Sequence, residues 1–358
     1  MPELGPLRPE RVAVYTLTLP GLKVAEAIHR ALPGSTLYVA GKYRGLLEAH
    51  FFDEPIRQLL ERTWPLHDGH VFVMAAGIVL RAIAPRILDK RVDPAVLVVD
   101  LKGRYFIPLL AGHLGGANPL ARYLAEALGG EAVLTTGTDS LALPAPDLLA
   151  KALSARVPDW EPLKEVSALL VDGRPVGFYS DCVDLSPLAR YPSLRILPSP
   201  HPEGVEAMVL FTVNKPFPLL VPALFAHPPA LVLGLGCNRG TPLEEIRREV
   251  FRFLEEGGFA REALARIATA TLKQDEAGLL AFAEEMGLPL GFHPPEVLNA
   301  KPIPNPSEVV FRHTGLYGVA EAAVLAEGAR LIVEKTKRGN LTLALGVLTL
   351  ALPEEALP

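Results

Sequence analysis

The sequence predicts an α/β fold in which two α/β domains with mostly parallel sheets flank a smaller α/β or β-rich middle domain. Short apolar runs alternate with helical stretches at the start of the chain and again after residue 228, whereas the middle is proline-rich and less regular. With 358 residues, 49% hydrophobic and 21% charged, the chain is long enough to form several cores. We expect domains at 1–140, 141–227 and 228–358.

In the first domain, strands are expected where β-branched and apolar residues fill short segments between turn residues. These segments are 12–19, 35–40, 70–77, 95–101 and 131–138. Apolar residues at three- and four-residue spacing predict helices at 22–32, 54–64, 78–88 and 119–129. The segment "DLKGRY", 100–105, predicts a hairpin, so the strand that follows it is expected to be antiparallel to the one before.

In the middle domain, residues 166–180 predict two strands joined at "DGRP", and 207–213 predict another. After residue 228 the alternation resumes. Strands are expected at 230–236, 265–273, 288–293, 330–337 and 340–350, and helices at 242–258, 275–287 and 318–329.

Composition excludes several classes of function. The net charge is −5 and no long basic run occurs, so no nucleic-acid partner is expected and a small molecule is favoured. Cys182 and Cys237 have no metal-ligand spacing, and the N-terminus resembles no signal peptide, so we expect a reduced, cytoplasmic protein. Residues 217–237 are long enough to span a membrane, but prolines and glycines interrupt them. We expect a linker and a buried strand there.

The most distinctive segment is "GHLGGAN", 112–118, between a strand and a helix. Asn118 is expected to cap that helix, which leaves free N–H groups and the positive end of the helix dipole to favour an anionic ligand. His113 is the best titratable candidate for acid or base catalysis, and Asp100 or Asp139 could orient it. A turn histidine bonded to a carbonyl is the structural alternative.

A similar loop occurs in "GLGCNRGTPLEEI", 234–246, where Thr241 is expected to cap a helix and Glu244 to complete a capping box. The glycine spacing does not match a dinucleotide fingerprint, and no nucleoside-triphosphate loop is present. For Cys237 a small buried cysteine is favoured over an activated thiolate. Two such loops in separate domains favour a site for a polyanionic ligand.

Several acidic residues have both a structural and a functional interpretation. Lys273 and Glu276 lie at a strand-to-helix junction, where they form either a salt-bridged cap or part of a site. Glu321 lies in the first turn of a helix, where the dipole favours an acid in any case.

Several long motifs together resemble one family. "HVFVMAAGIVLRAIAPRILDKRVDPAVLVVD", "LLAGHLGGAN" and "VLTTGTDS" resemble the N-terminal region of the cobalt-precorrin-5A hydrolases, the CbiG proteins of anaerobic cobalamin synthesis. "GLGCNRGTPLEEI", "IATATLKQDEAGLLAFAEEMGLPL", "NPSEVV", "GVAEAAVLA" and "KTKRGNLTLALG" resemble the family's C-terminal domain, which the CobE proteins share. The resemblance covers the two outer domains in the family's order.

The resemblance implies hydrolysis of the ring A δ-lactone of cobalt-precorrin-5A, with loss of the C20 fragment as acetaldehyde. It implies a corrinoid substrate, neighbouring pathway enzymes as further partners, no membrane and no nucleic acid. No cofactor is expected beyond the cobalt of the substrate, and no histidine is assigned as its ligand. The alternative is a non-catalytic corrinoid carrier.

On this resemblance, His113 is expected to act as base or acid, the Gly115 and Gly116 N–H groups as oxyanion donors, and Glu276 or Glu321 as the second proton-transfer group. The other residues expected to bind substrate are Gly77, Arg81, Lys90, Gly112, Asn118, Thr136, Asp139, Gly236, Cys237, Arg239, Gly240, Thr241, Lys273, Ser307 and Lys335. Asn238 stands where the family usually has a basic residue, which weakens one expected anion contact.

Overall fold

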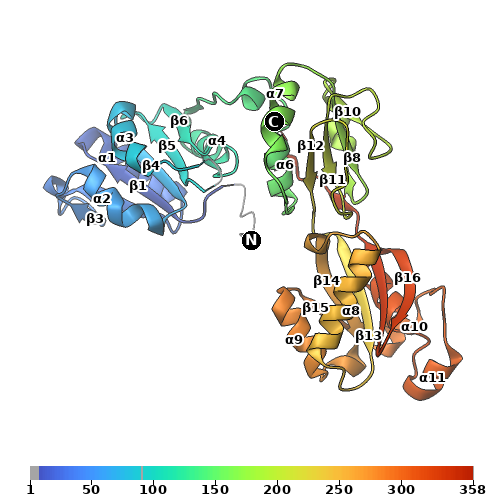
Figure 1. The fold of residues 1–358 in the computed structure, drawn as a ribbon. Coiled ribbons are helices and arrows are strands. Elements are labelled where there is room, and N and C mark those ends of the chain that lie inside the picture. Colours follow the sequence, from blue (N-terminus) through green and yellow to red (C-terminus); the bar gives the residue numbers. More distant parts are fainter. Residues whose placement is uncertain (1–7, 90–91, 358) are drawn as a thin grey trace. The chain divides into compact units, whose positions relative to one another are not determined.

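A computed structural model describes residues 8–89 and 92–357 (Figure 1). The chain forms two compact units, residues 1–152 with 354–358 and residues 153–353. Most of the expected middle and last domains thus lies within one unit, and the first unit extends beyond residue 140 to Ala152. The division into three domains stays a prediction.

The first unit contains a seven-stranded sheet in the order β3-β2-β1-β4-β5-β6-β7. Its strands are β1 (Val12–Thr16), β2 (Thr36–Ala40), β3 (His50–Phe52), β4 (Gly69–Val73), β5 (Ala95–Val99), β6 (Tyr105–Leu110) and β7 (Glu131–Ala132). The first five are parallel, β6 is antiparallel to β5, and β7 is parallel to β6. The mostly parallel α/β sheet and the hairpin at 100–105 are confirmed.

Helices cover both faces of this sheet. They are α1 (Leu19–Ala31), α2 (Ile56–Thr63), α3 (Ala76–Ile83) and α4 (Ala117–Leu128), and the chain after the sheet forms α5 (Gly137–Ser140) and α6 (Pro146–Ala152). One core packs α1 and α4 on the sheet, and the other packs α2 and α3 on the opposite face. The strand expected at 131–138 is wrong beyond Ala132. There the chain turns into α5, where Ser140 N–H bonds to the Thr136 carbonyl.

The second unit begins with α7 (Pro162–Val171) and a four-stranded parallel sheet in the order β10-β8-β11-β12. Its strands are β8 (Val176–Ser180), β10 (Leu194–Ile196), β11 (Ala207–Phe211) and β12 (Ala223–Ala226), and a separate pair joins β9 (Val183–Asp184) to β18 (Leu350–Ala351). The two strands expected over 166–180 are therefore half wrong. Leu163, Val166 and Leu170 are buried at helical spacing, so the first half is helix.

A second sheet in this unit has the order β15-β14-β13-β17-β16. It contains β13 (Leu231–Cys237), β14 (Leu264–Ala270), β15 (Leu290–His293), β16 (Arg330–Arg338) and β17 (Leu341–Val347), with α8 (Leu243–Glu256), α9 (Ala277–Met286), α10 (Pro295–Asn299), α11 (Glu308–Thr314) and α12 (Ala320–Ala326). Strands β13, β14 and β15 are parallel, whereas β17 is antiparallel to both β13 and β16. Gly234 lets α12 pack directly on β13, because a Cβ there would overlap the Ala320 carbonyl.

Residues 217–237 contain the expected buried strand β13, but the segment expected to be a linker also contains strand β12, which pairs with β11. None of the helices in the described part of the chain is both long and apolar enough to span a bilayer.

Candidate functional site

The direction of β6 determines where the "GHLGGAN" loop lies. Because β6 is antiparallel to β5, Leu110 at its end pairs with Val96 near the start of β5. The loop therefore lies at the edge of the sheet where β1, β4 and β5 begin, which we call the amino edge. Gly77 and Arg81 follow the end of β4 at the opposite, carboxyl edge. A five-residue strand is about 16 Å long, so the structure does not bring these expected binding residues together.

The expected capping of α4 by Asn118 is wrong. The helix begins at Ala117, its N-cap Gly116 has a left-handed φ of 86°, and the N–H groups of Ala117 and Asn118 bond to carbonyls of the loop. The Gly116 N–H also bonds to the His113 carbonyl at 2.9 Å, so it is not free to bind an oxyanion. The loop thus satisfies the start of the helix from its own backbone, and the amide of Asn118 is available for another partner.

That partner belongs to a cluster around His113. His113 Nε2 lies 2.9 Å from Asp139 Oδ2, and Nδ1 lies 3.2 Å from Asp147 Oδ2. Asn118 Nδ2 donates to the same Asp139 oxygen at 2.7 Å, and the Thr136 hydroxyl donates to it as well. Arg122 donates to Asp139 Oδ1 at 2.6 Å. Of the two aspartates that could orient His113, the structure therefore supports Asp139.

Asp100 has a different role. Its carboxylate accepts N–H groups of Lys102, Arg104 and Tyr105 within the hairpin between β5 and β6. It stabilises the turn that reverses β6.

His113 is a cation at neutral pH. Burial alone would lower its pKa, but the hydrogen bonds to Asp139 and Asp147 outweigh burial and raise the pKa to about 9. Burial raises the pKa of Asp139, yet hydrogen bonds from His113, Thr136 and Arg122 hold it well below the usual range. Both ring nitrogens therefore donate to carboxylates. The structure supports an ion-pair clamp over the expected base.

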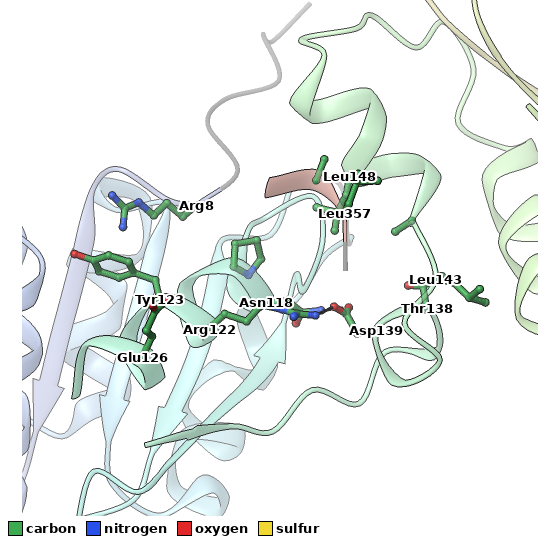
Figure 2. Close-up of a pocket in the computed structure, with 13 residues that line it drawn as sticks. Arg8, Asn118, Arg122, Tyr123, Glu126, Thr138, Asp139, Leu143, Leu148 and Leu357 are labelled. Atoms are coloured by element: carbon green, nitrogen blue, oxygen red, sulfur yellow. Dashed lines mark hydrogen bonds and ion pairs between the residues drawn. The ribbon is translucent and has the colours of Figure 1, made fainter. Parts of the chain in front are cut away.

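A cavity of about 600 Å³ is lined by several residues of this cluster. Figure 2 shows the side chains that line it. Asp139, Arg122, Asn118 and Thr138 supply polar lining groups. Its apolar lining includes Leu143, Ala145, Leu148, Ala356 and Leu357, the last two from the chain's C-terminal segment. In Figure 2, Arg122 points toward Asp139. His113 does not itself line this cavity, but it bonds to Asp139, which does.

A second cavity of about 400 Å³ lies at the amino edge. It is lined by the segments that precede β1, β4 and β5, together with Leu114, Gly115 and Lys151. Lys151 is 6% exposed, and its Nζ donates to the Leu114 carbonyl at 2.8 Å. Burial lowers its pKa to about 8, against the opposing effect of Asp147 and Asp68.

Sequence reasoning missed Asp147, Lys151 and Arg122. Helix α6 was not expected, although Asp147 and Lys151 stand four residues apart in "PDLLAKA", a spacing that places them on one helical face. This four-residue spacing could have indicated from the sequence that Asp147 and Lys151 lie side by side on a helix.

The carboxyl edge of the first unit is apolar and open. Ile78 and Leu80 of α3 are 38% and 57% exposed, and Leu19 and Leu101 are exposed after β1 and β5. Arg81 is exposed on the same helix. Lys90 lies outside the described residues.

The loop at 234–246 lies at the carboxyl end of β13, and its polar groups are already paired. Gly240 N–H donates to Glu276 Oε2 at 2.9 Å, and Lys273 Nζ donates to Oε1 at 3.0 Å. Burial raises the pKa of Glu276, but the Gly240 N–H and Lys273 outweigh burial and lower it. The structure thus shows the salt bridge between Lys273 and Glu276, but the Glu276 side chain accepts no N–H group of α9 and does not cap that helix.

The expected capping box at this loop is wrong. Helix α8 begins at Leu243, and the Thr241 hydroxyl donates back to the Asn238 carbonyl at 2.7 Å. Glu244 pairs with Arg247 one turn further along. The Thr241 hydroxyl therefore bonds within the loop instead of capping α8.

Cys237 and Arg239 flank the same loop. Burial raises the pKa of Cys237, so it is a thiol and not an activated thiolate. Gly236 lies beside Val319 and Thr342. Arg239 is exposed and donates to Asp275 at 2.7 Å.

Glu321 holds a neighbouring segment in place. It is 1% exposed and accepts the Asn305 N–H, the Asn305 amide at 2.8 Å and the Lys335 N–H at 2.9 Å. Lys335 Nζ donates to the Asn305 carbonyl, and Ser307 caps α11 by accepting the Val310 N–H. Proton transfer by Glu276 or Glu321 stays a prediction; both belong to the second unit, whereas His113 belongs to the first.

Comparisons with known proteins agree along the chain. Family models match residues 58–139 (cobalamin synthesis G N-terminal), 144–228 (cobalamin biosynthesis central region) and 231–346 (cobalamin synthesis G C-terminus). A cobalt-precorrin-5A hydrolase of Priestia megaterium is 31% identical over 353 residues, 94% of each chain. The chain belongs to the CbiG family. The resemblance inferred from the motifs is confirmed.

Two further relatives delimit the match. The cobalt-precorrin-5A hydrolase of Salmonella typhimurium is 32% identical, over 96% of this chain and 99% of its own. Protein CobE of a Sinorhizobium species is 40% identical over 120 residues, 32% of this chain and 78% of its own. In this CbiG chain, His113 and Asp139 fall within the N-terminal model, whereas Asp147 and Lys151 fall within the central one. The cluster therefore joins residues of two family regions.

Proposed function

We propose that this protein is a cobalt-precorrin-5A hydrolase, which opens the ring A δ-lactone and releases the C20 fragment as acetaldehyde to give cobalt-precorrin-5B. The observation that carries this proposal is the match over nearly the whole length of both chains to two relatives of that name. The N-terminal, central and C-terminal models are all present and in order.

The residues of both units suit a large substrate that carries carboxylates. In the first unit, Ile78 and Leu80 offer an apolar face beside Arg81 at the carboxyl edge, where α/β sheets usually bind ligands. In the second, Arg239 and Lys273 lie at the end of β13 and β14. The cobalt is part of the substrate, and we propose no other cofactor.

His113 contributes a fixed positive charge. Its imidazolium neutralises Asp147 and Asp139, and it holds Asp139 at the wall of the 600 Å³ cavity. With both nitrogens bonded, it does not take a proton from water in this arrangement. We therefore narrow its expected role from base or acid to a positioning residue. A cytoplasmic location and contacts with neighbouring pathway enzymes belong to the same proposal.

The test is product formation. The purified full chain is incubated anaerobically with cobalt-precorrin-5A, and acetaldehyde is measured by reduction with alcohol dehydrogenase and NADH. One acetaldehyde per substrate is expected, and none without protein. Tight binding of the corrinoid without acetaldehyde would support the carrier alternative instead.

A further inference from the structure

The cavity at the amino edge contains a buried amine with unused hydrogen-bonding capacity. Lys151 is 6% exposed and lines this cavity of about 400 Å³. An ammonium group has three donors, and within the described part of the chain Leu114 is its one hydrogen-bond acceptor, at 2.8 Å. Gly115 lines the same wall and has no side chain to cover the amine. Lys151 and Gly115 thus both line this cavity.

The other candidate groups are already occupied. Both nitrogens of His113 face carboxylates, and Asp139 accepts four side-chain donors. Glu276 is taken by Gly240 and Lys273, and Glu321 by Asn305 and Lys335. By contrast, Lys151 lines a cavity and has N–H donors that bond to no acceptor within the described part of the chain.

Charges near Lys151 are paired with other partners. Asp147, one turn earlier on α6, bonds to His113, and Asp68 before β4 bonds to the Arg11 N–H at 2.7 Å. Asp93 accepts the Leu88 N–H at 3.0 Å, and Arg8, Arg11 and Glu10 are further charged residues of the wall. No carboxylate thus forms a salt bridge with Lys151 among the described residues. Burial accordingly prevails and lowers the pKa of Lys151 to about 8, which suits a general base near neutral pH.

We infer that Lys151 is a catalytic proton-transfer residue of the lactone hydrolysis, acting from the wall of the amino-edge cavity. Its neutral amine takes a proton from the water whose oxygen bonds to the lactone carbonyl carbon. As the ring carbon–oxygen bond breaks, the ammonium returns that proton to the departing alkoxide, so no proton is gained or lost overall. The inference rests on the proposed function.

The first test compares two substitutions. Lys151→Arg keeps the charge and a donor for Leu114, but an arginine does not deprotonate at neutral pH. Lys151→Met removes the amine. We expect both variants to release acetaldehyde at least about 100-fold more slowly than the wild type, whereas Lys164→Arg on the exposed face of α7 changes nothing. Wild-type turnover by Lys151→Arg would overturn the inference.

A second test restores an amine of different basicity. Lys151→Cys is alkylated with 2-bromoethylamine to give thialysine, whose sulfur makes the amine less basic than lysine. Turnover should return, with the rise of kcat/KM with pH shifted to lower pH. Wild-type protein treated in the same way controls for modification of Cys182 and Cys237. A restored rate with an unshifted profile would contradict proton transfer by this amine.

The final measurement is independent of substrate. Competitive acetylation of the lysines over a pH series reports the titration of each amine in the whole chain. Lys151 should titrate near pH 8. If wild-type protein makes no acetaldehyde, the proposed function fails and the catalytic inference with it, whatever the titration. If it makes acetaldehyde but Lys151 titrates as an ordinary lysine, the inference alone fails.

Discussion

The two glycine loops of this chain have similar sequences and opposite positions. "GHLGGAN" and "GLGCNRG" each follow a strand and precede a helix, yet the first lies at the amino edge of its parallel strands and the second at the carboxyl edge. The difference arises from the preceding strand, since β6 is antiparallel to β5 whereas β13 is parallel to β14. A loop motif therefore does not determine which edge of a sheet it occupies.

The loops also differ in the charge at their centre. The first is organised around a cation, His113, between Asp139 and Asp147. The second is organised around an anion, Glu276, between the Gly240 N–H and Lys273. This difference predicts pH responses of opposite sign at the two loops and a larger loss of stability on substitution at the first.

The largest effect is expected from His113→Ala. The substitution leaves the largely buried carboxylates of Asp139 and Asp147 without their shared cation, which should cost about 4 kcal/mol in the free energy of unfolding of the first unit. Urea denaturation followed by hydrogen exchange of α4 and α6 would measure it. Lys23→Ala, at an exposed position of α1, is the control. A loss below about 1 kcal/mol would show that the ion pairs of His113 with Asp139 and Asp147 do not stabilise the first unit as expected.

The next effect is a pH dependence of opposite sign at the two loops. The pKa of His113 is raised to about 9, so its stabilisation is complete below pH 6.5 and is lost as pH rises to about 9, by about 3 kcal/mol. The pKa of Glu276 is lowered, so its stabilisation is present above the ordinary carboxyl range and is lost on acidification.

Unfolding curves at pH 6.5 and 9.5, with His113→Gln as control, test the first half of this prediction. Curves at pH 7 and 3, with Glu276→Gln, test the second. If the free energy of unfolding changed equally with pH in the wild type and in the variant of one loop, the prediction for that loop would be refuted.

A smaller effect is expected from Glu276→Ala. It leaves the Gly240 N–H without its acceptor and should destabilise the second unit by about 2 kcal/mol. Glu276→Gln keeps an acceptor and should cost about half as much. Glu284→Gln, exposed on the same helix, should have no measurable effect on the urea midpoint.

The smallest effects separate the glycines of the two loops. A Cβ at Gly115 would overlap Ala111, whereas Gly240 has open space but a φ of 75°. Gly115→Ala should therefore cost about 2 kcal/mol through steric overlap, and Gly240→Ala about 1 kcal/mol through backbone strain. Melting temperatures of the two variants would rank them, and the reverse order would show that strain dominates.

Periodicity predicted most elements of the two outer sheets, because their strands are short apolar runs and their helices are amphipathic. Periodicity predicted the wrong element where the local propensity of a segment and its tertiary contacts favour different structures. Residues 133–136 are rich in β-formers but precede α5, since Asp139 is held by Thr136, Arg122 and His113. The strand expected at 166–171 became α7 because Leu163, Val166 and Leu170 find a core on one helical face.

The candidate site was only half predictable. His113, Asn118, Thr136 and Asp139 all belong to the cluster, since each stands at a turn or a helix start. Asp147 and Lys151 were missed because their importance depends on where α6 packs. The capping roles of Asn118 and Thr241 were wrong because each side chain had another partner within reach.

The sequence by itself determined the α/β class, the hairpin that reverses β6, the CbiG family and the two glycine loops. Only the tertiary structure decided that one loop lies at the amino edge, that His113 is a cation shared by two carboxylates, and that Lys151 lines a cavity beside it. The physical reason is that propensity and spacing are local properties. By contrast, strand direction, burial and the pKa of a side chain depend on groups that are distant in sequence and close in space.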